Sequence, residues 1–67
     1  MSESWVIEKA VELSEKAAGL KNLTESESIQ ITAIERSIER ARDHKELVRL
    51  CRYYVETFQH LIEKKAA

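Results

Sequence analysis

Residues 47–62 read LVRLCRYYVETFQHLI, the densest run of large apolar side chains in the sequence. At about 100° per residue, the apolar side chains fall on one arc of roughly 160° and the charged ones on the opposite side. This period predicts an amphipathic helix over residues 44–64. Because one neighbouring helix cannot cover so wide an arc, we expect this helix to contact at least two others. The arc comprises Leu47, Leu50, Cys51, Tyr54, Val55, Phe58, Leu61 and Ile62.

A second apolar series, earlier in the chain, predicts a helix over residues 4–18. Its N-cap is expected at Ser2 or Ser4, since a serine hydroxyl accepts hydrogen bonds from the first free amides of a helix. Gly19, the only glycine, stands where a left-handed C-terminal cap is common. The series recurs every three or four residues and comprises Val6, Ala10, Leu13 and Ala17, widened by Ile7, Val11 and Ala18.

A third helix is predicted over residues 25–42. Thr24 and Glu27 have the spacing of a capping box, in which each side chain accepts a hydrogen bond from the other residue's amide. An apolar seam follows at spacings typical of helices that pack nearly parallel to a neighbour. It comprises Ile31, Ile34, Ile38 and Ala41.

The junction between the last two helices has two interpretations from sequence alone. Asp43 and Glu46 repeat the capping spacing, and the apolar phase slips by one residue between the seam before them and the arc after them. Both observations favour a tight turn near residues 42–44. The alternative is a single helix of about 40 residues, which would need a second chain to bury its apolar side.

Size and composition restrict how such a chain reaches stability. It has 67 residues, which predicts one domain over residues 1–67, and a domain this small buries only about 60% of the surface of its unfolded chain. One cysteine rules out an internal disulfide, so a metal or a second chain remains as support. No apolar run approaches the roughly 18–20 residues that cross a bilayer, and the start of the sequence is polar and acidic, unlike a signal peptide. With a free thiol as well, we expect a cytoplasmic protein without a membrane partner.

The sequence lacks the residue patterns that catalysis and metal binding require. His44, Cys51 and His60 are the possible soft metal ligands, and their spacing does not place them together on one helix. A single glycine excludes a glycine-rich phosphate loop. Six glutamates have a basic residue nearby in sequence and are interpreted as solvated helix pairs. They are Glu8, Glu12, Glu15, Glu35, Glu39 and Glu46. A unit this small is expected to lack a concavity of a few hundred Å³, so we predict no enzyme activity, no metal and no cofactor.

Protein–protein contact is the function that the remaining residues favour. Large apolar side chains lie off the predicted core stripes, and the arc of the last helix is wider than a single chain can cover. Trp, Tyr and Arg are enriched at interface hot spots. We therefore predict a homodimer in which the helices over residues 25–42 and 44–64 of two chains form a four-helix core. The predicted interface residues are Trp5, Ile29, Arg49, Leu50, Arg52, Tyr53 and Leu61.

The predicted architecture is an all-α, antiparallel three-helix bundle. The predicted function is that of a small non-enzymatic interaction module, an adaptor, chaperone-like partner or regulator, which binds a second copy of itself and an unidentified protein. The alternative is a nucleic-acid-associated regulator that uses Arg36–Arg52, a segment with six basic and three acidic side chains. Because acids are interleaved along that segment and the net charge is −1, the sequence argues against nucleic acid as a partner.

Overall fold

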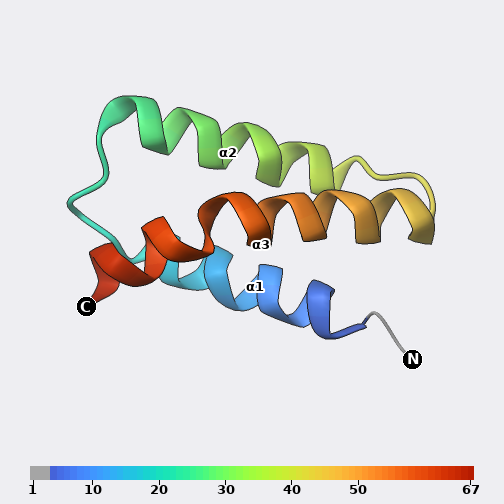
Figure 1. Cartoon of the computed structure of the whole chain (residues 1–67). Coiled ribbons are helices and arrows are strands. Elements are labelled where there is room, and N and C mark those ends of the chain that lie inside the picture. Colours follow the sequence, from blue (N-terminus) through green and yellow to red (C-terminus); the bar gives the residue numbers. More distant parts are fainter. Residues whose placement is uncertain (1–3) are drawn as a thin grey trace.

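The computed structural model describes residues 4–67 and folds them into three α-helices. These are α1 (Ser4–Ala18), α2 (Glu25–Glu39) and α3 (His44–Ala66). Consecutive helices run in opposite directions, and α3 lies between α1 and α2 (Figure 1). The predicted all-α three-helix bundle is confirmed, and α2 and α3 are separate helices.

Side-chain caps begin the last two helices at the predicted residues. The Thr24 amide donates to Glu27 Oε1 at 2.9 Å, and the Glu27 amide donates to Thr24 Oγ1 at 3.1 Å, which completes the capping box. At the start of α3, the Glu46 amide donates to the Asp43 carboxylate at 2.8 Å. Asp43 therefore separates α3 from α2, because its extended backbone cannot continue a helix.

Several helix ends differ from the predictions, and α3 runs to Ala66 rather than residue 64. α2 ends at Glu39 rather than residue 42, because the amide of Arg40 bonds back to Ser37 and that of Ala41 to Ile38, which tightens the last turn. Gly19 does not adopt a left-handed cap, since no described residue has a positive φ. Its amide donates to the Lys16 carbonyl at 3.1 Å, so α1 also ends in a tightened turn. Of the two predicted N-caps of α1, Ser4 already belongs to the helix and Ser2 lies outside the described residues.

The core is a single cluster centred on α3. All four positions of the predicted α1 series are buried, whereas α2 contributes only Ile31 to the fully buried set. Tyr54 and Phe58 pack with ring centroids 5.6 Å apart. α3 therefore contacts both other helices, as its wide arc predicted. The cluster comprises Val6, Ala10, Leu13, Ala17, Ile31, Cys51, Tyr54, Val55, Phe58 and Ile62.

At the edges of the apolar stripes of α3 and α1, the burial of several side chains differs from the prediction. On α3, Val48 is buried, while Leu47, Leu50 and Leu61 are only half-buried. The buried face of this helix is therefore narrower than the predicted arc. On α1, Ile7 is half-buried and Val11 is 54% exposed, and Ala18 is exposed too. These side chains do not become core because α1 and α2 both pack on α3 and make few direct contacts with each other.

Polar contacts tie the C-terminal end of α3 to the rest of the chain. Lys65 Nζ donates to Glu27 Oε1 at 2.8 Å and to the carbonyl of Asn22 at 3.0 Å. Lys9 of α1 pairs with Glu63 of α3 at 3.4 Å. These contacts join α3 to α1, to the start of α2 and to the connection between them.

Candidate protein-binding groove

A groove of about 260 Å³ opens between α1 and α2, with α3 as its floor. The two outer helices lie on different sides of α3 (Figure 1), and the groove follows the strip between them. We call this strip the α1–α2 groove. It is lined by Ile7, Ala10, Val11 and Ser14 of α1, by Glu35, Ile38 and Glu39 of α2, and by Leu47, Cys51 and Tyr54 of α3.

The α1–α2 groove is predominantly apolar, and part of its apolar surface faces solvent. Val11 is 54% exposed at its rim, and Ile7, Ile38 and Leu47 are half-buried along its walls. A second hollow of about 350 Å³ continues between the same helices towards their connection and shares Ser14 and Glu35. The expectation that this chain lacks a concavity of a few hundred Å³ is therefore wrong. Exposed apolar side chains in a concave strip are typical of a binding surface.

One carboxylate in the α1–α2 groove joins all three helices. Oε2 of Glu35 (α2) accepts a hydrogen bond from Ser14 Oγ (α1) at 2.6 Å and from Tyr54 Oη (α3) at 3.1 Å. Glu35 is half-buried, and Tyr54 is fully buried. Burial, and next the Glu35 charge, raise the pKa of Tyr54, so its hydroxyl stays protonated and donates. The interpretation of Glu35 as a solvated helix pair is therefore wrong.

Spacing along the sequence does not predict this contact. Glu35 is separated from Ser14 by 21 residues and from Tyr54 by 19. Its sequence neighbours include basic residues that would satisfy it on a solvated helix, as they satisfy Glu12, which pairs with Lys9 at 3.3 Å and with Lys16 at 3.7 Å. Only the packing of α1 and α2 on α3 brings the three side chains together.

The predicted interface residues do not form one patch, and none of them lines the α1–α2 groove. Trp5 on α1 is 59% exposed and Ile29 on α2 is 61% exposed, but they belong to different helices and different faces. On α3, by contrast, Tyr53 is 53% exposed and has half-buried Leu50 and Leu61 along the same side of the helix. These three residues are the apolar part of the prediction that the structure brings together.

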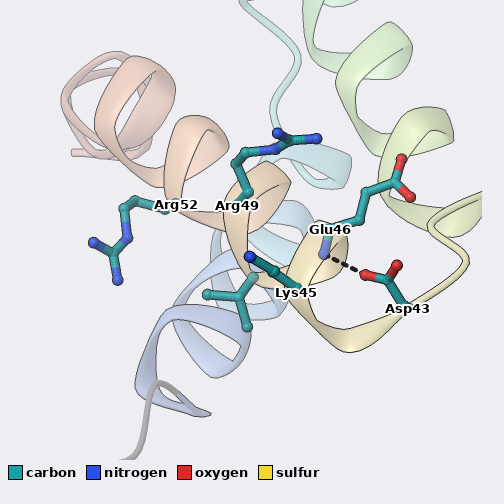
Figure 2. Close-up of a pocket in the computed structure, with 6 residues that line it drawn as sticks. Asp43, Lys45, Glu46, Arg49 and Arg52 are labelled. Carbon is teal, nitrogen blue, oxygen red and sulfur yellow. Dashed lines mark hydrogen bonds between the residues drawn. The ribbon is translucent and has the colours of Figure 1, made fainter.

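Arg49 and Arg52 line a different, shallow hollow at the start of α3, together with Lys45, Asp43 and Glu46. Figure 2 shows the two guanidinium groups pointing in different directions, while the Asp43 carboxylate points at the Glu46 amide. Basic side chains that diverge, with two carboxylates between them and the turn, do not converge on one phosphate position.

Cys51 is buried beneath the α1–α2 groove, and burial raises the pKa of its thiol, which disfavours the reactive thiolate. Among residues 4–67, no three His, Cys, Asp or Glu side chains group in a way that would hold a metal ion. None of the described helices has the length and apolar character to cross a membrane.

Comparison with known proteins identifies no relative of this chain. No protein-family model matches the chain, and neither a curated protein nor a solved structure matches it.

Proposed function

We propose that this chain is a small, non-enzymatic protein-interaction module that binds an amphipathic helix of another protein in the α1–α2 groove. The observation that carries the proposal is the apolar lining of that groove, with Val11 exposed at its rim. A helix that lays apolar side chains into such a strip buries both surfaces at once.

The charges of the groove specify the partner further. Its lining includes two carboxylates, Glu35 and Glu39, and no basic residue. A helix that carries Lys or Arg beside its apolar face would complement these carboxylates, whereas an acidic helix would meet repulsion. From Ile7 to Ser14 the groove runs along two turns of α1, or about 10 Å, which matches apolar anchors at positions i, i+3 or i+4, and i+7 of a partner. Because the contact is short, we expect a weak and transient complex.

The experiment uses a defined peptide as a probe. A fluorescent, amphipathic peptide of Leu and Lys, with Leu at i, i+3, i+4 and i+7, is titrated with the chain and followed by fluorescence polarisation. Replacing Val11 with Gln should weaken binding about tenfold, because the rim loses its apolar contact without a change of charge. Ile29→Gln is the matched control, since Ile29 is also an exposed β-branched residue of a helix but lies outside the groove. Equal affinities for the two variants would refute the proposal.

Nucleic-acid binding through Arg36–Arg52 is the competing function, and the same titration tests it with a DNA duplex as the probe. The diverging side chains of Arg49 and Arg52 lead us to expect no binding at physiological salt (Figure 2). A salt-dependent affinity that disappears in Arg49→Ala/Arg52→Ala would favour nucleic acid instead. We also propose a cytoplasmic location, supported by the free thiol of Cys51, which suits a reducing compartment.

A further inference from the structure

We infer that α3 pairs with α3 of a second copy of this chain, antiparallel and about a two-fold axis, through a face that the single chain leaves partly uncovered. We call this face the α3 seam. Its residues recur at spacings of four, three, four, four and three, the period of a helix–helix contact. None of its members is fully buried. The seam comprises Glu46, Leu50, Tyr53, Thr57, Leu61 and Lys64.

The core of the single chain covers the apolar members of the α3 seam only in part. The buried residues of α3 centre on Cys51 and Val55, and the seam lies roughly 130° around the helix from them. Tyr53 is 53% exposed, and Leu50 is half-buried without belonging to the side chains that pack against the core cluster. Tyr53 is therefore mainly exposed, and Leu50 and Leu61 are only partly covered within their own chain, although Leu61 also packs against the core cluster.

The order of residues along the α3 seam is self-complementary, which identifies the partner as a second copy. Counted from Val55, Glu46 and Lys64 each lie nine residues away in opposite directions, and Tyr53 and Thr57 each lie two away. Leu50 and Leu61 lie five and six away. An antiparallel pair whose axis crosses the α3 seam at the level of Val55, between Tyr53 and Thr57, therefore places leucine against leucine and glutamate against lysine at both ends. A two-fold contact requires this property, because each residue must suit its counterpart.

The opposite orientation lacks this complementarity. A parallel pair would place Glu46 beside Glu46 and Lys64 beside Lys64 of the second copy, and like charges at both ends of a contact are unfavourable. The charges therefore select the antiparallel arrangement.

The adjoining flank of α2 allows the second copy to approach. Ser28, Thr32 and Glu35 of α2 turn towards α1, so Gln30 and Ser37 lie on the opposite flank, beside the α3 seam. Both are uncharged, and the Ser37 hydroxyl already donates to the Ala33 carbonyl at 3.1 Å within its own helix. A second copy that packs against Gln30 and Ser37 therefore buries no unpaired charge. The two α2–α3 pairs would then form a four-helix core.

Sedimentation velocity of the whole chain, from about 1 µM to about 1 mM, tests the inference, with circular dichroism to verify that each variant folds. We expect a reversible dimer whose dissociation constant rises about 100-fold in Leu50→Lys, because the two-fold axis repeats the change. Ile29→Gln and Val11→Gln should dimerise like the parent chain, which separates this contact from peptide binding in the α1–α2 groove. A monomer throughout that range, or a dimer that Leu50→Lys leaves unchanged, would overturn the inference.

A charge exchange tests the orientation. Lys64→Glu places two glutamates opposite each other at both ends and should weaken the dimer about tenfold. The double variant Glu46→Lys/Lys64→Glu restores an opposite-charge pair in the antiparallel arrangement only, so it should recover most of the affinity. Failure of the second change to rescue the first would overturn the antiparallel pairing.

Discussion

Replacing Tyr54 with Phe tests whether the Glu35 carboxylate holds the three helices together. The change removes one buried hydroxyl, which donates to Glu35 Oε2 at 3.1 Å, and keeps the ring that packs on Phe58. A hydrogen bond to a charged group contributes about 1.5–3 kcal/mol. Because Glu35 is half-buried, water can replace part of the lost contact. We therefore expect a loss of about 1–1.5 kcal/mol, from a total of about 3–10 kcal/mol for a chain of this length.

The assay is thermal and urea unfolding followed by circular dichroism. A loss of about 1 kcal/mol should lower the midpoint temperature by about 4–8 °C in a domain of this size. Tyr53→Phe is the matched control, because it removes the same hydroxyl from the neighbouring, exposed tyrosine. That variant should unfold within about 0.5 kcal/mol of the parent chain.

A double-mutant cycle with Glu35→Ala completes the test. That single change leaves the buried Tyr54 hydroxyl without its carboxylate and should cost about 1–3 kcal/mol. Combined with Tyr54→Phe, it should cost less than the sum of the two, with a coupling energy of about 1 kcal/mol. If Tyr54→Phe behaves like Tyr53→Phe, or if the two changes add, the contact with Glu35 does not stabilise the bundle.

Three further predictions concern stability. Phe58→Ala should cost about 3–5 kcal/mol and leave little folded chain at room temperature, as circular dichroism would show, because this ring lies in the core cluster. Gly19→Ala should raise the free energy of unfolding in urea by about 0.4–1 kcal/mol. Its backbone has no positive φ, and an added Cβ would meet only the Lys16 carbonyl oxygen at 3.6 Å. Lys65 and the Thr24 amide lower the pKa of Glu27, so that contribution to stability is present above the ordinary pKa of a glutamate and disappears as the pH falls through the lowered value. Urea midpoints measured at successive pH values should fall on acidification, and Glu27→Gln should reduce that fall.

The parts of the fold that depend on neighbours in sequence were predictable. The Thr24–Glu27 box and the Asp43 cap need only the three-residue spacing of a helix start. The α1 series was predictable because α1 packs against one helix. Such a contact requires a single apolar stripe, which appears in the sequence as apolar residues every three or four positions. Gly19 was not predictable in the same way, because a helix can end in a left-handed residue or in a tightened turn, and glycine permits both.

The α1–α2 groove was not predictable because it depends on how far apart two helices sit on a third. Val11 lies at the edge of the predicted α1 stripe, and it stays exposed because α1 and α2 both pack on α3 and make few contacts with each other. Glu35 has the sequence surroundings of a solvated residue, yet its partners come from two other helices. The exposure of Trp5, Ile29 and Tyr53 was predictable from their places on the helices, whereas their separation into different surfaces required the packing of the whole chain.

Cys51 lies at the floor of the α1–α2 groove, where its reactivity reports local opening of the folded chain. α2 contributes one fully buried side chain to the core, so brief detachment of this helix should require less free energy than complete unfolding. Each detachment would uncover the sulfur, which is only 1% exposed while the helices are docked. The rate at which a thiol reagent modifies the folded chain therefore reports how often α2 lifts away. A helix bound in the groove, which Cys51 lines, would hold α2 in place and slow that reaction.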